Sequence, residues 1–265
     1  MGSDVLDQQV SCLWQGDHVL SVSLAGFITY LDQNNPDKPL RVVKGHNKSI
    51  TAMTTSITSD QKSLYTASHD GFVTVWNAET GTNDRVSGNG HTNQVQGLVT
   101  GSSAIYSIGL DDTIRSICLL SNKYTNLNIK LDCQPRGISV MKDGDNLIVA
   151  GIANVSVINP GSGARLFSLP VSYEPSCVSV HPTAPDVAVG GNKDNNVHIY
   201  SVTGHALSEK LVLNFLGPVT DVSYSPDGKY LAAADANKQF NLFFTEDYKV
   251  RLILNCLKID LFYGF

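Results

Sequence analysis

The sequence lacks an excess of basic residues. Its 19 lysines and arginines stand against 24 aspartates and glutamates, which gives a net charge of −5. No run of Lys and Arg offsets this balance. A surface that binds phosphate backbones regardless of sequence needs such an excess. We therefore expect no nucleic-acid partner.

Cysteine is scarce and shows no paired spacing. The five cysteines are odd in number and form no C-x-x-C pair; they are Cys12, Cys118, Cys133, Cys177 and Cys256. This pattern predicts reduced thiols in an intracellular protein and not a disulfide framework. The seven histidines are equally dispersed, without the spacing of zinc ligands. We expect no metal and no cofactor.

Long apolar segments and helical periodicity are missing as well. No basic segment followed by an apolar run opens the chain, so we expect no secretory signal. The apolar stretch at residues 251–265 is too short to cross a bilayer as a helix. We therefore expect a cytoplasmic protein without a membrane partner. Hydrophobic residues nevertheless make up 42% of the chain, which is enough for a substantial core.

The chain does contain a repeat. "SHDGFVTVW" at residues 68–76 is a tight polar turn followed by an alternating strand that ends at Trp76. Equivalent strand ends recur downstream in steps of 41 to 43 residues, and upstream at a step of 46; they are Tyr30, Ile117, Ile158, Tyr200 and Phe243. Two shorter strand-like runs precede most of these strands. Both faces of "GFVTVW" are largely apolar, so each sheet should be covered on both sides, as in stacked blades.

Motifs beside these strands resemble those of the WD40-repeat family. "KGH" (44–46) precedes "SHDGFVTVWN", and "NGH" (89–91) precedes "GLDDTIRSI". The resemblance implies an all-β, WD40-type β-propeller over residues 1–250, with about six recognisable four-stranded blades. We expect this propeller to be incomplete relative to a seven-bladed ring. Residues 251–265 are predicted to form an atypical apolar tail.

The resemblance also implies a buried hydrogen-bonded tetrad in each complete repeat. In the second repeat, the matching residues are His46, Ser68, Asp70 and Trp76. An imidazole held between a carboxylate and a hydroxyl, with the indole N–H as the last donor, would satisfy polar groups buried between blades. The alternative for Asp70 is a general base, which the matched spacing disfavours.

The other repeats are less complete. The third keeps His91 and Asp111 but has Ile117 in place of tryptophan. The fourth has neither the Gly-His nor the aspartate, and the fifth and sixth keep only Asp194 and Asp235. Degenerate tetrads are usual in the family, so the predicted fold is unchanged. By this criterion, no tetrad is predicted to stabilise the fourth repeat.

Longer segments resemble one branch of the family, the actin-binding WD-repeat proteins with two propellers. These segments include "KGHNKSI" (44–50), "IKLDCQP" (129–135), "YEPSCVSVHP" (173–182) and "GPVTDVSYSPDGKYLA" (217–232). This resemblance implies actin filaments and a cofilin-family protein as partners, filament disassembly as the activity, and a cytoskeletal location. A generic WD40 scaffold and a truncated fragment without its own function are the alternatives.

Loops at the rim of a propeller commonly carry binding. The rim candidates for partner contact are Lys44, Asn47, Lys48, His69, Asn93, Gln94, Asp112, Lys193 and Asn195. No catalytic residue is predicted, because the adjacent carboxylates Asp111 and Asp112 are explained by the turn. The Gly-rich residues 159–164 open no helix and are not followed by Lys-Ser or Lys-Thr. We therefore expect no enzyme activity and no small-molecule substrate.

Overall fold

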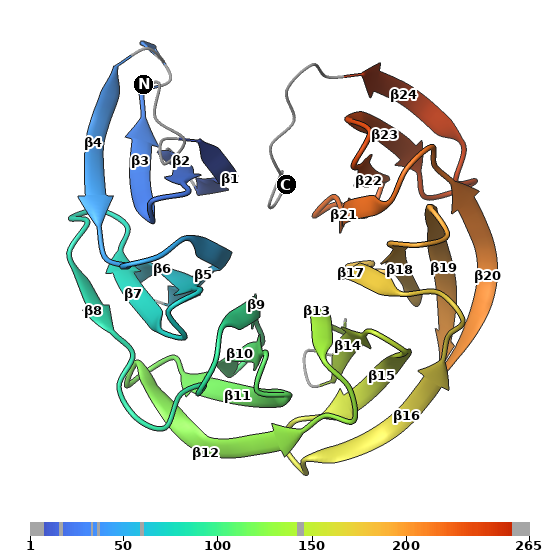
Figure 1. Cartoon of the computed structure of the whole chain (residues 1–265), viewed down its shortest axis with the longest axis horizontal. Helices are drawn as coiled ribbons and strands as arrows, with labels where there is room; N and C mark the ends of the chain where they lie inside the picture. Colours follow the sequence, from blue (N-terminus) through green and yellow to red (C-terminus); the bar gives the residue numbers. More distant parts are fainter. Residues whose placement is uncertain are drawn as a thin grey trace. The chain divides into compact units, whose positions relative to one another are not determined.

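The computed structural model describes residues 8–15, 18–32, 34–35, 38–58, 61–141 and 146–255. Over these ranges it consists of β-strands and turns. The strands form six four-stranded antiparallel sheets, which we number as blades 1 to 6 in chain order (Figure 1). Contacts divide the chain into two compact units, one ending at Lys130 and the other beginning at Leu131. Blades 1–3 belong to the first unit and blades 4–6 to the second.

In the first unit, each blade follows the chain from one strand to the next. Blade 1 contains β1 (Gln9–Gln15), β2 (His18–Ser23), β3 (Phe27–Leu31) and β4 (Pro39–Lys44). Blade 2 contains β5 (Ile50–Thr58), β6 (Gln61–Ser68), β7 (Val73–Asn77) and β8 (Asn83–Arg85). Blade 3 contains β9 (Val95–Thr100), β10 (Ala104–Gly109), β11 (Thr113–Cys118) and β12 (Lys123–Lys130).

The second unit has the same organisation. Blade 4 contains β13 (Pro135–Val140), β14 (Leu147–Gly151), β15 (Asn154–Asn159) and β16 (Ala164–Pro170). Blade 5 contains β17 (Pro175–Val180), β18 (Asp186–Gly191), β19 (Asn196–Thr203) and β20 (Ala206–Asn214). Blade 6 contains β21 (Val219–Tyr224), β22 (Tyr230–Asp235), β23 (Gln239–Phe244) and β24 (Val250–Asn255).

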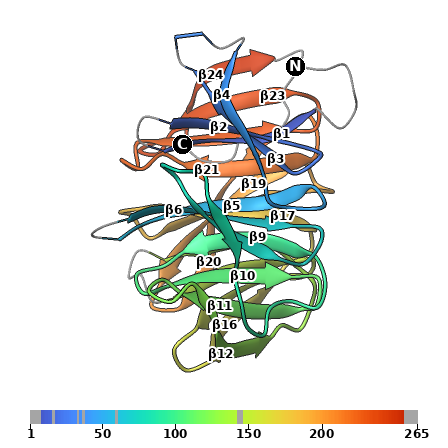
Figure 2. The ribbon, with the colours of Figure 1, turned by 90° about the vertical axis from the view of Figure 1, so that its left-hand side faces the viewer.

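Blade 2 is covered on both faces within the first unit. Leu64 pairs with Trp76 across β6 and β7, and the next pair, Tyr65 with Val75, points to the opposite face. Leu64 and Trp76 pack with Leu20 of blade 1. Tyr65 packs with residues of blade 3, among them Val95, Leu98, Ile105 and Ile117. Figure 2 shows these sheets edge-on, with β5 and β6 between β2 and β10.

Blade 5 occupies the corresponding position in the second unit. Val187 and Tyr200 pack with Ile148 and Val155 of blade 4. The other face of blade 5 packs on blade 6 through Ala188, Val197 and Ile199, which contact Val219, Tyr224 and Phe243. Every member of these two clusters is less than a tenth exposed. Continuous apolar strands therefore result from burial on both faces, as the sequence pattern predicted.

The predicted strand ends lie in the third strand of each blade. Trp76 is in β7, and the downstream ends are in β11, β15, β19 and β23. The upstream end at Tyr30 is wrong by one residue. Gly26 (φ 81°) and Gly71 (φ 83°) occupy equivalent turns, so Leu31 is the residue that corresponds to Trp76. Because side chains alternate along a strand, this shift places Tyr30 on the face toward blade 2.

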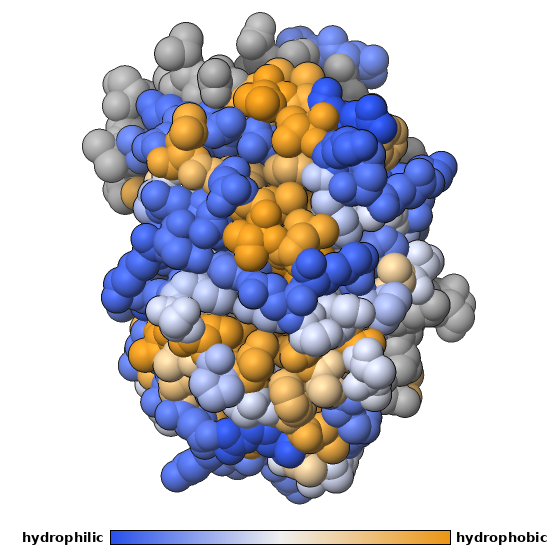
Figure 3. All heavy atoms as spheres, turned by 90° about the vertical axis from the view of Figure 1, so that its right-hand side faces the viewer, coloured by the Kyte–Doolittle hydropathy of each residue, from blue (hydrophilic) through white to orange (hydrophobic). Residues whose placement is uncertain are grey.

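The boundary of the predicted tail also needs correction. β24 covers Val250–Asn255 and pairs with β23, for example through Leu242 with Leu252, so residues 251–255 belong to blade 6. Residues 256–265 lie outside the described residues. The side chains of β24 are unusually exposed for apolar groups: Val250 44%, Leu252 43%, Ile253 53% and Leu254 43%. Apolar surface gathers near the top of Figure 3, at the level of β24 in Figure 1.

Candidate functional site

A buried polar network links the entry of blade 2 to its third strand. The His46 Nε2 atom lies 2.7 Å from Thr66 Oγ1, and the Trp76 indole N–H donates to the same hydroxyl oxygen over 2.7 Å. On the other side of the imidazole, Nδ1 is 3.6 Å from a carboxylate oxygen of Asp70. Gly45 lets the chain approach, since a Cβ there would lie 2.2 Å from the indole ring. The network satisfies the indole N–H inside the core.

Thr66, and not Ser68, supplies the hydroxyl of this network. Both side chains are fully buried on the same face of β6, but Thr66 lies two residues deeper in the sheet. Trp76 pairs with Leu64, which places the indole diagonally opposite Thr66 and out of reach of Ser68. Ser68 donates to the Lys48 carbonyl and accepts from the Asp70 amide, so it stabilises the turn. The predicted role of Ser68 is therefore wrong.

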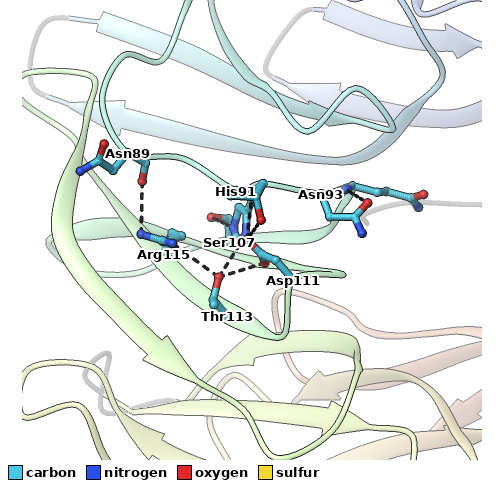
Figure 4. Close-up of polar contacts among 9 residues, drawn as sticks. Asn89, His91, Asn93, Ser107, Asp111, Thr113 and Arg115 are labelled. Carbon is cyan, nitrogen blue, oxygen red and sulfur yellow. Dashed lines mark hydrogen bonds and ion pairs between the residues drawn. The ribbon is translucent and has the colours of Figure 1, made fainter.

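Blade 3 builds the same network around His91 (Figure 4). The imidazole Nδ1 is 2.8 Å from Asp111 Oδ1, and Nε2 is 2.8 Å from Ser107 Oγ. Thr113 donates to Asp111 Oδ1 over 2.9 Å, and the Thr92 amide donates to Oδ2 over 3.0 Å. In both blades, the hydroxyl residue precedes the turn aspartate by four positions. That spacing is the sequence signal by which Thr66 and Ser107 could have been found.

Tyr124 takes the place of the missing tryptophan in blade 3. Ile117 fills the position equivalent to Trp76 and is fully buried, but it has no polar group. A Cβ on Gly90 would lie 2.8 Å from the Tyr124 ring, just as a Cβ on Gly45 would meet the Trp76 ring. Burial raises the pKa of the Tyr124 phenol, which keeps it neutral. An aromatic ring from the outer strand β12 thus covers the Gly-His segment.

Electrostatics keep both imidazoles neutral and both carboxylates charged. Burial lowers the pKa of His46 and His91 below the ordinary value, although the neighbouring aspartates oppose this shift. Burial by itself raises the pKa of Asp70, but the amides of Phe72 and Asn47, together with His46 and the Ser68 hydroxyl, outweigh it, so the net shift is downward. Asp70 is therefore engaged in the turn and the network, which disfavours the general-base alternative.

Blade 5 has a different network, built around His198. The imidazole Nε2 lies 2.7 Å from Asp194 Oδ2, and Nδ1 lies 2.6 Å from Glu209 Oε1. The Tyr173 ring stacks on the imidazole in parallel, with centroids 3.8 Å apart, and its hydroxyl is 2.8 Å from that of Tyr200. Burial, together with Tyr200, raises the pKa of Tyr173. Asp194, predicted from its turn position, thus bonds a histidine of its own blade, which sequence reasoning had missed.

In blade 6, the turn aspartate bonds backbone amides among the described residues. The Asp235 carboxylate accepts the Gly217 amide over 3.0 Å and the Gln239 amide over 2.9 Å. Blade 4 has an exposed Ile152 in the equivalent turn, and Cys133 donates to Asn154 Oδ1 nearby. The turn aspartate is therefore used three ways, with an external histidine, an internal histidine or backbone amides alone.

In the first unit, several rim candidates lie close together. The His69 Nδ1 atom is 2.5 Å from Gln94 Oε1, which joins the turn of blade 2 to the entry of blade 3. The Asn47 amide donates to Asp70 Oδ2 over 3.3 Å, and Asn93 accepts the Gln94 amide. The side chains of Lys44, Asn47, Lys48, His69 and Asn93 are exposed. Their contact with a partner stays a prediction.

Three other candidates have clear structural duties. Asp112 (φ 55°) and Asn195 (φ 58°) adopt the left-handed conformation that tight turns require. The Asn195 carbonyl also accepts the Phe215 amide over 2.9 Å. In the second unit, the Lys193 ammonium lies 3.0 Å from Glu174 Oε2. These contacts give each of the three residues a structural role within the chain.

Neither a metal centre nor a membrane-spanning helix emerges from the described part of the chain. Within it, no group of three or more His, Cys, Asp or Glu side chains could hold a metal ion, and no helix is long and apolar enough to cross a membrane. Among the described cysteines, Cys12, Cys118, Cys133 and Cys177 are free thiols. A cavity of about 420 Å³ in the second unit is lined mainly by apolar residues such as Met141, Val180 and Pro185.

Replacing Thr66 by valine is expected to destabilise the protein by about 1–3 kcal/mol, because the Trp76 N–H and an imidazole nitrogen lose their shared partner. The matched control is Thr74→Val, since the Thr74 hydroxyl is buried in the same blade without a hydrogen bond. That control should be neutral or slightly stabilising. Urea unfolding of both variants measures the difference, and equal costs would contradict the network.

Acidification from pH 7 to pH 5 is expected to remove the stability that the buried, neutral imidazoles of His46 and His91 contribute. The pKa of His46 and His91 is lowered in the folded state, whereas unfolded histidines titrate near 6.5. At these two sites the unfolded chain binds more protons in this range, so their contribution falls as the pH falls. Burial raises the pKa of Asp221 to about 7, and this carboxyl acts in the opposite direction. Urea midpoints of the wild type and His91→Gln at pH 7, 6 and 5 separate the two effects, because the variant should lose less stability on acidification, and an equal pH dependence of the two proteins would contradict the assignment.

Comparison with known proteins agrees with the geometry. The WD40 family model, described as WD domain, G-beta repeat, matches residues 37–77 and 209–243. Actin-interacting protein 1 of Drosophila melanogaster is 47% identical over 249 residues, covering 94% of this chain and 40% of that protein. WD repeat-containing protein 1-B of Xenopus laevis is 43% identical over 251 residues, covering 93% and 41%. The chain thus spans about two fifths of the length of these relatives.

Solved structures show the fold. The β-propeller domain of Cps50 (Swd1) from Myceliophteria thermophila superposes with a TM-score of 0.77 at 14% identity, covering 93% of this chain and 86% of that one. A chain of the Mitotic Checkpoint Complex gives a TM-score of 0.78 at 18% identity, covering 89% and 74%. With the WD40 matches and the close relatives, the six blades identify this chain as a WD40-repeat β-propeller protein, homologous over nearly all its length to part of Actin-interacting protein 1.

Proposed function

We propose that this chain binds actin filaments and, together with a cofilin-family protein, promotes their disassembly. The observation that carries the proposal is the 47% identity to Actin-interacting protein 1 over 94% of the chain. The name of that relative states an interaction with actin. Cofilin enters through the resemblance of segments such as residues 217–232 to the actin-binding WD-repeat branch. Since the chain spans 40% of that relative, the proposal concerns the matched portion by itself.

The mechanism is binding by a rigid surface. Turns such as residues 45–49, 69–71 and 91–94 are fixed by the buried networks beneath them, and they present polar side chains to solvent. A fixed surface loses little conformational entropy when it binds. It would hold filament subunits that cofilin has already loosened. No catalytic step and no cofactor are needed, and the protein would work in the cytoplasm at the actin cytoskeleton.

Two other functions fit the fold alone. A generic WD40 scaffold would bind a different protein through the same turns and would be indifferent to actin. A fragment without function of its own would fold and yet bind neither. Both alternatives lack the support that the close relatives give to actin, so we place them second.

Co-sedimentation with actin filaments tests the proposal. Soluble, monomeric protein should pellet with filaments, and the pelleted fraction should rise when cofilin is present. Filament severing observed by fluorescence microscopy should also be faster with both proteins than with cofilin alone. Bovine serum albumin and filament-free samples control for trapping and aggregation.

Absence of pelleting under both conditions, from protein that still melts cooperatively, would contradict the proposal. If the pelleted fraction is the same with and without cofilin, actin binding would be supported but joint action with cofilin would be contradicted. Thermal unfolding of the same preparation separates a folded non-binder from a misfolded sample.

A further inference from the structure

The two units differ in the ion pairing of their lysine and arginine side chains. Among the described residues, every ion pair between a Lys or Arg and a carboxylate lies in the second unit; these pairs are Arg136–Glu174, Arg165–Asp132, Lys193–Glu174, Lys210–Asp186, Lys229–Asp227 and Lys249–Asp247. In the described part of the first unit, the carboxylates of Asp70 and Asp111 face the buried and neutral imidazoles of His46 and His91. The described lysines and arginines of the first unit are therefore not neutralised by an ion pair.

Three of these unpaired cations surround one segment of the rim. Lys44 ends β4, Lys48 follows in the turn, and Arg85 ends β8; all three side chains are exposed. The Asn83 amide donates to the Lys44 carbonyl over 3.4 Å, which brings the start of β8 to the end of β4 (Figure 1). Arg85 is also close enough to His46 for its charge to lower the pKa of that imidazole. We call Lys44, Lys48 and Arg85, with the two rings described next, the cationic rim.

Aromatic rings hold two of the cations in place. The Lys44 ammonium lies 4.2 Å from the centroid of the Phe27 ring, and the Arg85 guanidinium lies 4.1 Å from that of Phe72. Phe27 and Phe72 each follow a positive-φ glycine of equivalent turns, Gly26 and Gly71. The same cation–aromatic pair is thus built on adjacent blades. A stacked cation keeps its charge available while losing side-chain freedom in advance.

The nearby acidic residues do not neutralise this surface. The Asp70 side chain is 8% exposed, and its oxygens accept the amides of Asn47 and Phe72 while facing His46. Asp84 directly precedes Arg85 in β8 and pairs with Val75. Because side chains alternate along a strand, the Asp84 side chain points to the opposite face of β8 from that of Arg85. A chain with a net charge of −5 therefore presents a local group of three positive charges.

We infer that the cationic rim binds a carboxylate-bearing surface of a protein partner, which under the proposed function is the actin filament. This inference rests on the proposed function for the identity of the partner, but not for its chemistry. Lys44 and Arg85 lie on separate strands and stack on separate rings, and Lys48 lies in a turn, so the three cations match several spaced carboxylates better than one compact anion. The exposed Phe72 ring, at 44%, adds apolar contact beside the charges. The overall acidity disfavours a polyanion such as nucleic acid.

The experiment compares two double variants with equal changes of charge. Lys44→Glu/Lys48→Glu reverses two of the three charges of the cationic rim, whereas Lys229→Glu/Lys249→Glu changes exposed lysines of the second unit that lie in ion pairs. Binding to actin filaments is measured by co-sedimentation at 50 and 200 mM salt. We expect at least a tenfold weaker affinity for the first variant and less than a threefold change for the control. The salt dependence of the wild type should be reduced in the first variant only.

A second probe makes the result independent of actin. Fluorescein-labelled hexaglutamate, followed by anisotropy at low salt, should bind the wild type and the control at least fivefold more tightly than Lys44→Glu/Lys48→Glu. The milder Lys44→Gln/Lys48→Gln variant serves if the charge reversal impairs folding, as judged by thermal melting. If hexaglutamate binds as expected and actin filaments do not bind, the proposed function is contradicted, whereas the inference that the cationic rim binds carboxylates is supported. Equal binding by both variants, or no binding of the wild type to either probe, overturns the inference.

Discussion

Burial of each interior sheet on both faces is the constraint from which the rest of the structure follows. Blade 2 has apolar side chains on two faces, and so does blade 5 in its own unit. Covering both faces removes polar groups at the blade junctions from water. A buried indole N–H or imidazole without a partner costs free energy, so these groups must bond to each other. The shared hydroxyl of Thr66 meets this requirement with a single side chain.

The same requirement is met by different residues in different blades. Trp76 bonds the hydroxyl in blade 2, Tyr124 covers the glycine in blade 3, and Tyr173 pairs with Tyr200 in blade 5. In each of these three blades an aromatic ring packs at the junction that carries the buried polar groups. Loss of the tryptophan motif in a repeat is therefore poor evidence that its blade is weak. Other aromatic residues pack at these blade junctions instead of the tryptophan, and no short sequence motif describes their positions.

Much of the fold could be predicted from the sequence, because the third strand of each blade carries both a turn and an alternating pattern. The outer strands could not be recognised in the same way. β24 has no motif and few polar residues, so its sequence resembles an apolar tail until pairing with β23 is seen. The error at Tyr30 has a related cause. Strand periodicity fixes which residues alternate but not the position of the turn, and a slip by one residue reverses the face.

The candidate site was harder to predict, since its residues are defined by depth in the sheet. Ser68 and Thr66 have the same type of side chain and face the same way, and only the diagonal position of Trp76 decides between them. His198 and Glu209 come together because β19 and β20 pair, which their separation in sequence does not indicate. Partners on different strands remain invisible without the register.

The buried networks and the exposed rim are structurally connected. Asp70 connects them, because its carboxylate faces the buried His46 while accepting the amides of Asn47 and Phe72 at the surface. The segment that follows His46 and the ring that supports Arg85 are thereby fixed to the core by one side chain. A surface held this way can present charges in a set geometry without a folding step on binding. Under the proposed function, the acidic residue that marks the repeat in the sequence would contribute to recognition through the position it imposes on its neighbours, and not through contact of its own.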